Sequence, residues 1–316
     1  MEIMLEDSAP VGGVDYPRTC QEFRDWFPDD QACLDYLATL RWPRGFECPR
    51  CGSGGFWRIS QRRLRMCVDC GRKTSVTAGT IFDRTRSPLS TWFAAVWFVT
   101  SQKTGVSAQG LQRVLGFGSY ETAWAWLHKM RRAMVRPDRE RLGGIVEVDQ
   151  TFIGGVTAGK RGASTNKIPV TIAVERDERD RIGRIRLEVA DRPNSAEMVE
   201  FTAEIAEPGT IIRTDGASVW LRLTLMGYEH EPVAGIHADD PDQITPGVHL
   251  VASLLKRWIA GTLHHRISHV HLPYYLDEFT FRFNRRTSTA RGLLFYRLLQ
   301  QALDTDPHPL KELTGG

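Results

Sequence analysis

Four of the six cysteines in this sequence are spaced to bind one metal ion. They form two CxxC pairs, Cys48 with Cys51 and Cys67 with Cys70, and fifteen residues separate the pairs. Two knuckle turns that each supply two thiolates are typical of a tetrahedral structural zinc site, and the glycine after each pair suits the positive φ of such a turn. Two disulfides or two redox motifs are the alternatives, which a reducing compartment and this spacing disfavour. We therefore expect a zinc ribbon.

Asp149 lies in a segment that alternates apolar and polar residues. Within residues 145–152, Val146 and Val148 alternate with Glu147 and Asp149, which is the period of a half-buried strand. Aspartate is disfavoured inside strands. Asp149 therefore either marks a solvent face or is held by the strand for chemistry, with Glu147 on the same side to support it.

A second aspartate, Asp215, ends a later predicted strand. The sequence predicts strands at residues 145–152, 168–175 and 185–189, a helix at residues 195–206, and a strand at residues 210–215. This order predicts a mixed α/β sheet, and such sheets place functional residues where strands end. If the first and fourth strands are neighbours, Asp149 and Asp215 converge, which a divalent cation would make tolerable.

A helix predicted over residues 246–261 brings a third group to this site. At 100° per residue, Val251 and Leu255 fall on one face, and His249 and Lys256 fall almost opposite. The latter two are seven residues apart and stack on one side, about 10 Å apart along the axis. A metal ligand with a phosphate-binding cation beyond it suits a nucleic-acid backbone.

Basic residues concentrate in two regions of a chain whose net charge is only +3. Residues 41–90 hold eleven Arg or Lys against three acids, and residues 249–301 hold eight against two. Two such regions indicate a polyanionic partner. The expected DNA contacts are Arg62, Arg63 and Arg65 on the ribbon hairpin, Lys129, Arg131 and Arg132 on a helix, and Lys160 and Arg161 in a glycine-rich loop.

Three helices are predicted between the ribbon and the sheet. The first follows Pro88, the second starts at Ser107, and the third starts at Ser119, which is the expected N-cap after a Gly-Phe-Gly turn. The last two fit a helix-turn-helix that would bind DNA. A plain three-helix packing unit is the alternative.

Length and composition bound the organisation of the chain. Its 316 residues, 41% of them hydrophobic and 25% charged, suit a soluble protein of two or three domains. No apolar stretch reaches the ~20 residues of a membrane span, and the acidic N-terminus is unlike a signal peptide, so we expect no membrane partner and a cytoplasmic location. The expected domains are an N-terminal helical segment at 1–40, a zinc ribbon at 41–83, a trihelical DNA-binding domain at 84–138, an α/β domain at 144–302 and a tail at 303–316.

Together these segments resemble bacterial insertion-sequence transposases of the DDE class, in the zinc-ribbon subgroup with an ISXO-like catalytic domain. The resemblance is carried by the ribbon, VEVDQTFIGG at 146–155, TDG at 214–216, VHLVASLLKRWIAGT at 248–262 and YLDEFTFRFNRR at 275–286. It implies a ribonuclease-H-like mixed sheet with flanking helices, catalytic Asp149 and Asp215, and a third ligand followed by a cation seven residues later. That ligand is usually glutamate, whereas this chain has His249, followed by Lys256.

The resemblance also implies a reaction. Such an enzyme binds the terminal inverted repeats of an element, cleaves at its ends and transfers the 3′-hydroxyl to target DNA. Asp149 and Asp215 would hold two Mg²⁺ or Mn²⁺ ions, and Lys256 would anchor a phosphate. Imidazole suits manganese better than magnesium, so His249 departs from the usual ligand set. Pairing two DNA ends implies a homodimer or larger complex on double-stranded DNA, associated with the nucleoid.

Two other functions fit part of the sequence. A zinc-ribbon and helix-turn-helix regulator explains the first 140 residues, but it gives no reason for the spacing of Asp149, Asp215, His249 and Lys256. A transposase relic that binds DNA without cutting it explains the replacement of glutamate by His249.

Overall fold

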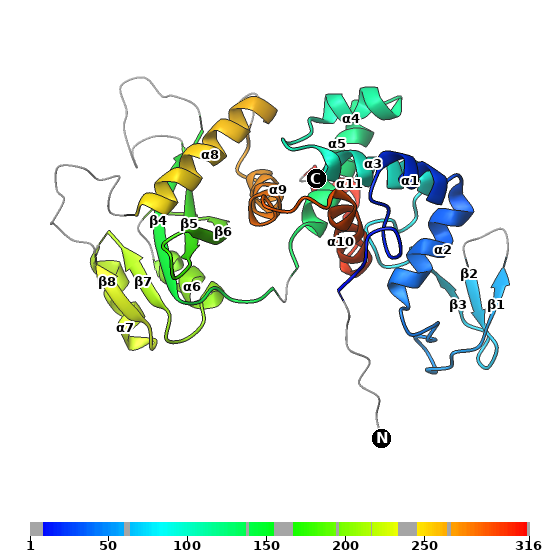
Figure 1. The fold of residues 1–316 in the computed structure, drawn as a ribbon, viewed down its shortest axis with the longest axis horizontal. Helices are drawn as coiled ribbons and strands as arrows, with labels where there is room; N and C mark the ends of the chain where they lie inside the picture. Colours follow the sequence, from blue (N-terminus) through cyan, green and yellow to red (C-terminus); the bar gives the residue numbers. More distant parts are fainter. Residues whose placement is uncertain are drawn as a thin grey trace. The chain divides into compact units, whose positions relative to one another are not determined.

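The computed structural model describes residues 9–59, 64–136, 139–154, 167–193, 196–215, 217–232, 245–263 and 267–314 (Figure 1). They fall into two compact units. The first, which we call the ribbon-helix unit, comprises Met1–Arg136 and Ser288–Gly316, and the second, the sheet unit, comprises Pro137–Thr287. None of the described helices is both long and apolar enough to cross a bilayer.

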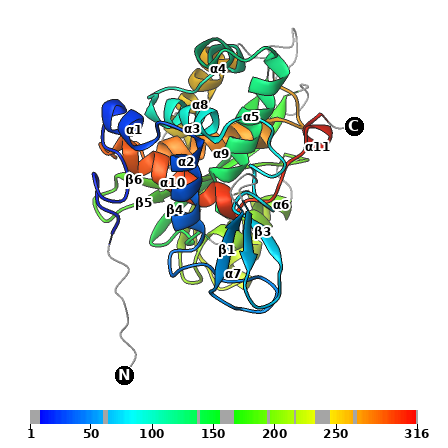
Figure 2. The ribbon, with the colours of Figure 1, turned by 90° about the vertical axis from the view of Figure 1, so that its right-hand side faces the viewer.

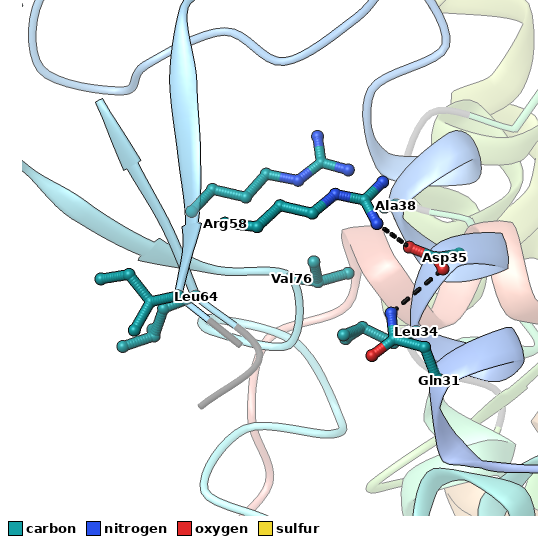
Figure 3. A pocket seen from close by; sticks show the side chains of 9 residues that line it. Gln31, Leu34, Asp35, Ala38, Arg58, Leu64 and Val76 are labelled. Carbon is teal, nitrogen blue, oxygen red and sulfur yellow. Dashed lines mark hydrogen bonds and ion pairs between the residues drawn. The ribbon is translucent and has the colours of Figure 1, made fainter. Parts of the chain in front are cut away.

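The zinc ribbon of the ribbon-helix unit is a small antiparallel sheet that rests on a helix. Its strands are β1 (Phe56–Ile59), β2 (Leu64–Cys67) and β3 (Lys73–Ser75), in that order. Arg58 reaches from β1 to Asp35 on α2 (Asp30–Arg41), with a guanidinium-to-carboxylate distance of 3.2 Å (Figure 3). The cavity beside this largely exposed ion pair measures only about 50 Å³, which is too small for a nucleotide.

Side-chain caps and buried aromatic residues define the helices around the ribbon. The remaining helices of this unit are α1 (Cys20–Trp26), α3 (Leu89–Ser101), α4 (Ala108–Leu115), α5 (Tyr120–Ala133), α10 (Arg291–Asp304) and α11 (Leu310–Leu313). The Ser107 and Ser119 hydroxyls accept backbone N–H bonds at the starts of α4 and α5. Gly116 ends α4 with a φ of 68°, which glycine adopts without strain. The three predicted helices are therefore present, and Ser119 is the cap of the third.

The last helices of the chain complete the core of the ribbon-helix unit (Figures 1 and 2). Phe295 of α10 lies with its ring centroid 5.5 Å from that of Phe23 and 5.7 Å from those of Phe27 and Phe93. The structure thus differs from the sequence-based division, which placed α10 in the α/β domain. The apolar stripe of α10 reads in sequence like that of a helix covering a sheet, and only the tertiary contacts reveal its partner.

The sheet unit contains a five-stranded mixed sheet in the order β6-β5-β4-β7-β8. Its strands are β4 (Ile145–Ile153), β5 (Ile168–Arg176), β6 (Ile182–Val189), β7 (Ile211–Thr214) and β8 (Glu229–Pro232). β4, β5 and β6 are antiparallel, whereas β7 runs parallel to both β4 and β8. This confirms the predicted class, a mixed α/β sheet with flanking helices preceded by a zinc ribbon and helices, and it is consistent with a ribonuclease-H-like fold.

Helices cover both faces of this sheet (Figure 1). The helices α8 (Pro246–Leu263) and α9 (Leu272–Asn284) pack on Val170 and Ile172 of β5. The other face, which includes Val146 and Val148 of β4, is covered by α6 (Ala196–Ile205), the 3-10 turn η2 (Ser218–Trp220) and α7 (Leu221–Leu225). Because strand residues alternate between faces, the odd-numbered residues of β4, Glu147 and Asp149 among them, lie on the α8 side.

Candidate active site and zinc centre

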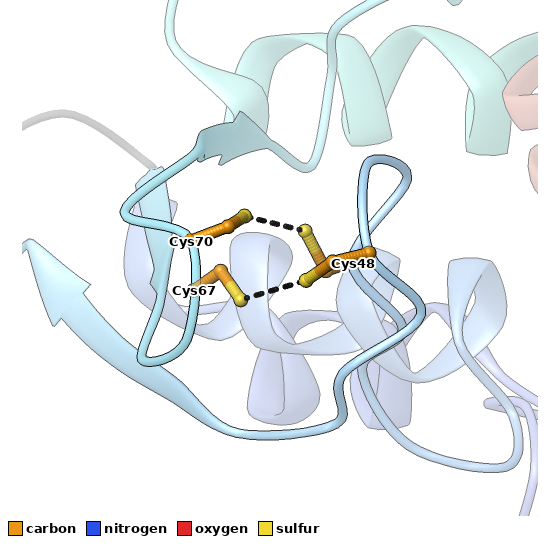
Figure 4. Close-up of side chains that lie close together, drawn as sticks. Cys48, Cys67 and Cys70 are labelled. Carbon is orange, nitrogen blue, oxygen red and sulfur yellow. Dashed lines mark hydrogen bonds between the residues drawn. The ribbon is translucent and has the colours of Figure 1, made fainter.

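The zinc centre lies at the two knuckle turns of the ribbon. The sulfur atoms of Cys48, Cys51, Cys67 and Cys70 all lie within 4.8 Å of one another, and the closest pairs are 3.5 and 3.6 Å apart (Figure 4). Sulfurs at the corners of a zinc tetrahedron are about 3.8 Å apart for Zn–S bonds of about 2.3 Å. The predicted tetrad is therefore a cluster that fits one Zn²⁺ ion.

The local backbone prepares these thiols to bind a metal. The glycines that follow the two pairs, Gly52 and Gly71, have φ values of 73° and 67°, as the knuckle turns require. Backbone N–H groups, that of Cys70 foremost, lower the pKa of Cys67 to about 6. The thiolate, which is the form that binds zinc, is thereby favoured near neutral pH at Cys67. At Cys51 the backbone N–H of Ser53 acts in the same direction, but hydrogen bonds with the thiols of Cys70 and Cys67 raise the pKa to about 12.

The basic residues expected to contact DNA have different surroundings. The Arg65 guanidinium lies 4.3 Å from the ring centroid of Phe56 and 4.4 Å from that of Trp42, so it packs within the ribbon as a cation–π contact. Arg62 and Arg63, together with Lys160 and Arg161, lie outside the described residues.

The three basic residues of α5 differ in exposure. Arg131 is 2% exposed, and its guanidinium donates to the carbonyl of Val106, so in this structure it is not available to a phosphate. The burial of Arg131 in the helical core therefore disagrees with the DNA contact that the sequence predicts for it. Lys129 is half-buried, and Arg132 is exposed.

Asp149 lies on β4, and Asp215 directly follows the last residue of β7, the parallel neighbour of β4. The pairing of β4 with β7 extends to Glu147 opposite Arg213, and Asp149 and Asp215 each lie two residues beyond this pair. Burial raises the pKa of Asp149, and the charge of Asp215 raises it further. The two carboxylates therefore repel one another at the end of β7, as expected for a pair that a cation would bridge.

Hydrogen bonds orient each of these carboxylates. Asp149 accepts the backbone N–H of Gln150 at 2.6 Å and the hydroxyl of Thr245 at 3.3 Å. Asp215 accepts the indole N–H of Trp220 at 3.0 Å, and Trp220 is itself only 1% exposed. Both oxygens of Asp149 and the Oδ1 atom of Asp215 thus accept hydrogen bonds from the protein.

His249 and Lys256 project from α8 as the helical pattern predicts. The buried residues of this helix include Val248, Val251 and Leu255, whereas His249 is half-buried and Lys256 is exposed. The charge of His249 lowers the pKa of Asp149, so the imidazole is a neighbour of that carboxylate. Partial desolvation, and then the charge of Lys167, lower the pKa of Lys256, which indicates a second cation near it.

Two carboxylates and an imidazole are a ligand set that suits a divalent cation such as Mn²⁺. Among the described residues, however, only the four cysteines form a group of three or more His, Cys, Asp or Glu side chains whose ligand atoms lie close enough together to hold a metal. The charges of Asp215 and His249 act on Asp149, but the ligand atoms of these three residues do not lie as close together as the four sulfurs do.

Several residues around the site carried little or no signal in the sequence. Trp220 orients Asp215 from the turn η2, and His230 on β8 has its Nε2 atom 2.9 Å from the Thr214 hydroxyl. Burial holds the pKa of His230 below its ordinary value, although the nearby charge of Asp215 acts in the opposite direction. β8 has the sequence EHEP, which lacks apolar alternation, so only its pairing with β7 could have revealed this histidine.

Comparison with known proteins agrees with both parts of the structure. Residues 141–284 match the ISXO2-like transposase domain, and residues 28–73 match the transposase zinc-ribbon domain. A protein of Halobacterium salinarum described as an uncharacterized protein in transposable element ISH50 is 27% identical over 292 residues, which cover 81% of this chain and 91% of that relative. The first match ends where α9 ends, before α10.

Proposed function

We propose that this chain, in which a match to the transposase zinc-ribbon domain precedes a match to the ISXO2-like transposase domain, is a transposase that cleaves DNA at the ends of an element and transfers the 3′ ends to target DNA. The observation that carries the proposal is the pairing of β4 with β7, which brings Asp215 near enough to Asp149 for the charges of Asp215 and of His249 to act on that carboxylate. A protein that only binds DNA gains nothing from two carboxylates held close enough to repel one another.

Each residue of the site has a role in this proposal. Asp149 and Asp215 hold divalent cations, with His249 at the edge of the same site. Two bound Mg²⁺ or Mn²⁺ ions supply the charge that activates the attacking water or 3′-hydroxyl and stabilises the leaving oxygen of an in-line displacement. Thr245 and Trp220 orient the carboxylates. Lys256, two helical turns beyond His249, binds a phosphate of the strand being cut.

The ribbon-helix unit supplies recognition of the terminal inverted repeats. Arg132 and Lys129 of α5 contact the phosphate backbone in this proposal, together with Arg62 and Arg63 of the hairpin. Lys160 and Arg161 contact DNA that flanks the cleaved strand. Two copies of the chain bind the two ends of the element, because joining them requires a paired complex.

A second candidate is a relic that binds DNA without cutting it. The specific observation that favours it is His249, which stands where the resemblance has glutamate. Imidazole binds magnesium poorly and manganese better, so cleavage with Mn²⁺ alone fits an active enzyme, whereas the relic predicts no cleavage with either metal.

Strand cleavage by the purified, zinc-loaded chain tests both candidates. The substrate is duplex DNA from the boundary of the element that carries the gene, with Mg²⁺ or Mn²⁺ added. We expect wild type to nick this DNA, and Asp149→Asn and Asp215→Asn to abolish nicking while still binding it. Asp191→Asn, which alters an exposed aspartate of the same unit, is the matched control and should cut normally. A wild type that binds the ends but nicks nothing with either metal is the relic.

A further inference from the structure

Glu147 is a buried carboxylate that holds the start of α8. It is 0% exposed and lies two residues before Asp149 on β4. Its Oε2 atom accepts the backbone N–H of Gly247 at 2.7 Å and that of Val248 at 3.3 Å. The first N–H groups of a helix have no acceptor within the helix, so Glu147 supplies the acceptor from a neighbouring strand.

The charge of Glu147 is balanced inside the protein. Arg176 at the end of β5 has its Nε atom 3.4 Å from Glu147 Oε1, and only 8% of this arginine side chain is exposed. Arg176 also pairs with Asp180 at 2.9 Å. The guanidinium on one side and the N-terminus of α8 on the other offset part of the cost of burying a carboxylate.

Gly247 is required for this close approach. A Cβ atom at this position would lie 2.6 Å from Oε2 of Glu147 and 2.9 Å from a terminal nitrogen of Arg176. Such distances are shorter than van der Waals contact, so any larger residue would push the first turn of α8 away from β4.

We propose that Glu147 is a positioning residue that fixes the first turn of α8 and thereby sets where His249 stands relative to Asp149 and Asp215. The inference rests on the proposed function. β4 holds this turn at two points, because Thr245 just before the helix donates to Asp149 while Gly247 and Val248 donate to Glu147. His249 is the next residue. A buried ion pair is a costly way to gain stability alone, whereas it fixes a geometry that an apolar contact would leave free to slide.

The first experiment measures binding of Mn²⁺ alone, by the electron paramagnetic resonance signal of the free ion. Glu147→Gln removes the charge, and Gly247→Ala keeps the carboxylate but displaces the helix. Losing such a supporting contact typically weakens metal binding by about 10–100-fold, which is the loss expected for both variants. The control is Glu278→Gln, because Glu278 is equally buried but pairs with Arg282 within α9. It should bind Mn²⁺ like wild type, and all variants are compared at unchanged zinc content and at a temperature where circular dichroism shows each of them to be folded.

The second experiment asks whether Glu147 acts through His249. In a chain that already carries His249→Ala, adding Glu147→Gln should weaken Mn²⁺ binding no further. A merely structural role would instead lower the affinity by the same factor in both backgrounds, and that outcome overturns the proposal.

A third measurement needs no metal and separates this inference from the proposed function. The nuclear magnetic resonance signals of the His249 ring, assigned with His249→Ala, should shift in Glu147→Gln and Gly247→Ala but not in Glu278→Gln. If wild type binds no Mn²⁺ and the ring signals still shift, the proposed function fails and the positioning role stands. If Mn²⁺ binds and neither affinity nor ring signals change, the positioning role is wrong and the proposed function stands.

Discussion

Arg131 and Arg132 follow one another in α5, yet the first is 2% exposed inside the helical core and the second is exposed to solvent. We expect Arg132→Ala to weaken DNA binding without changing stability, and to reduce the salt slope of the binding constant by about one. Arg131→Ala should instead lower the free energy of unfolding by about 1–3 kcal/mol. Fluorescence anisotropy at several salt concentrations and urea titration measure the two effects. A loss of DNA affinity in Arg131→Ala at unchanged stability would contradict this assignment.

Replacing Asp149 should stabilise the metal-free protein. Burial and then Asp215 raise the pKa of Asp149, so its contribution to stability is present below the ordinary aspartate pKa and is lost as pH rises through the raised value. Asp149→Asn avoids that loss and should melt higher than wild type at pH 7.5, with the difference shrinking toward pH 4. Each kcal/mol corresponds to roughly 2–4 °C for a domain of this size.

Added metal should reverse this order. Mn²⁺ should raise the melting temperature of wild type, since it binds only the folded site, and should leave that of Asp149→Asn unchanged. A metal-free Asp149→Asn variant that melts below wild type at pH 7.5 would contradict a destabilising charge at Asp149.

Zinc retention should depend on pH through the thiolates. In the metal-free tetrad the pKa of Cys67 is lowered to about 6, so its contribution to the stability of the zinc-free fold is present above the unfolded pKa and is lost as pH falls through about 6. Protons then compete with zinc for the sulfur. A chelator should therefore remove zinc faster at pH 5.5 than at pH 8, as followed with a chromogenic zinc indicator. Cys67→Ser should lose zinc at both values, whereas Cys20→Ser, which alters an exposed thiol outside the tetrad, should retain it.

α10 should stabilise the ribbon-helix unit. Phe295 is 0% exposed among the rings of Phe23, Phe27 and Phe93. Phe295→Ala should cost about 3–5 kcal/mol and weaken DNA binding. Hydrogen exchange resolves which unit opens: amides of α2 and α3 should lose protection, whereas those of β4 and β5 should not. Leu276→Ala in α9 is the matched change and should produce the opposite pattern.

The parts of this structure that local spacing determines were predictable from the sequence. The cysteine tetrad, the strand of Asp149 and the helix of His249 each follow from periodicity within a single segment. The neighbourhood of Asp149 and Asp215 required one further assumption, that the first and fourth strands are adjacent.

Contacts between distant segments were not predictable in this way. Glu147 binds Gly247 a hundred residues away, and nothing in the sequence around Glu147 names that partner. Arg65 and Arg131 read as surface cations, because a sequence gives their charge and not the rings or carbonyls that surround them. α7 and β8 were missed, since β8 has no apolar alternation and is a strand only because β7 pairs with it.

The division of the chain into units has a consequence for how the protein is made. The sheet unit interrupts the ribbon-helix unit, whose core needs the helix that begins at Arg291. The ribosome therefore synthesises the entire sheet unit before it synthesises α10, the helix that completes the core of the ribbon-helix unit. A nascent or prematurely terminated chain would fold its sheet while its proposed DNA-reading half stays open, so DNA recognition would begin only once α10 has been made.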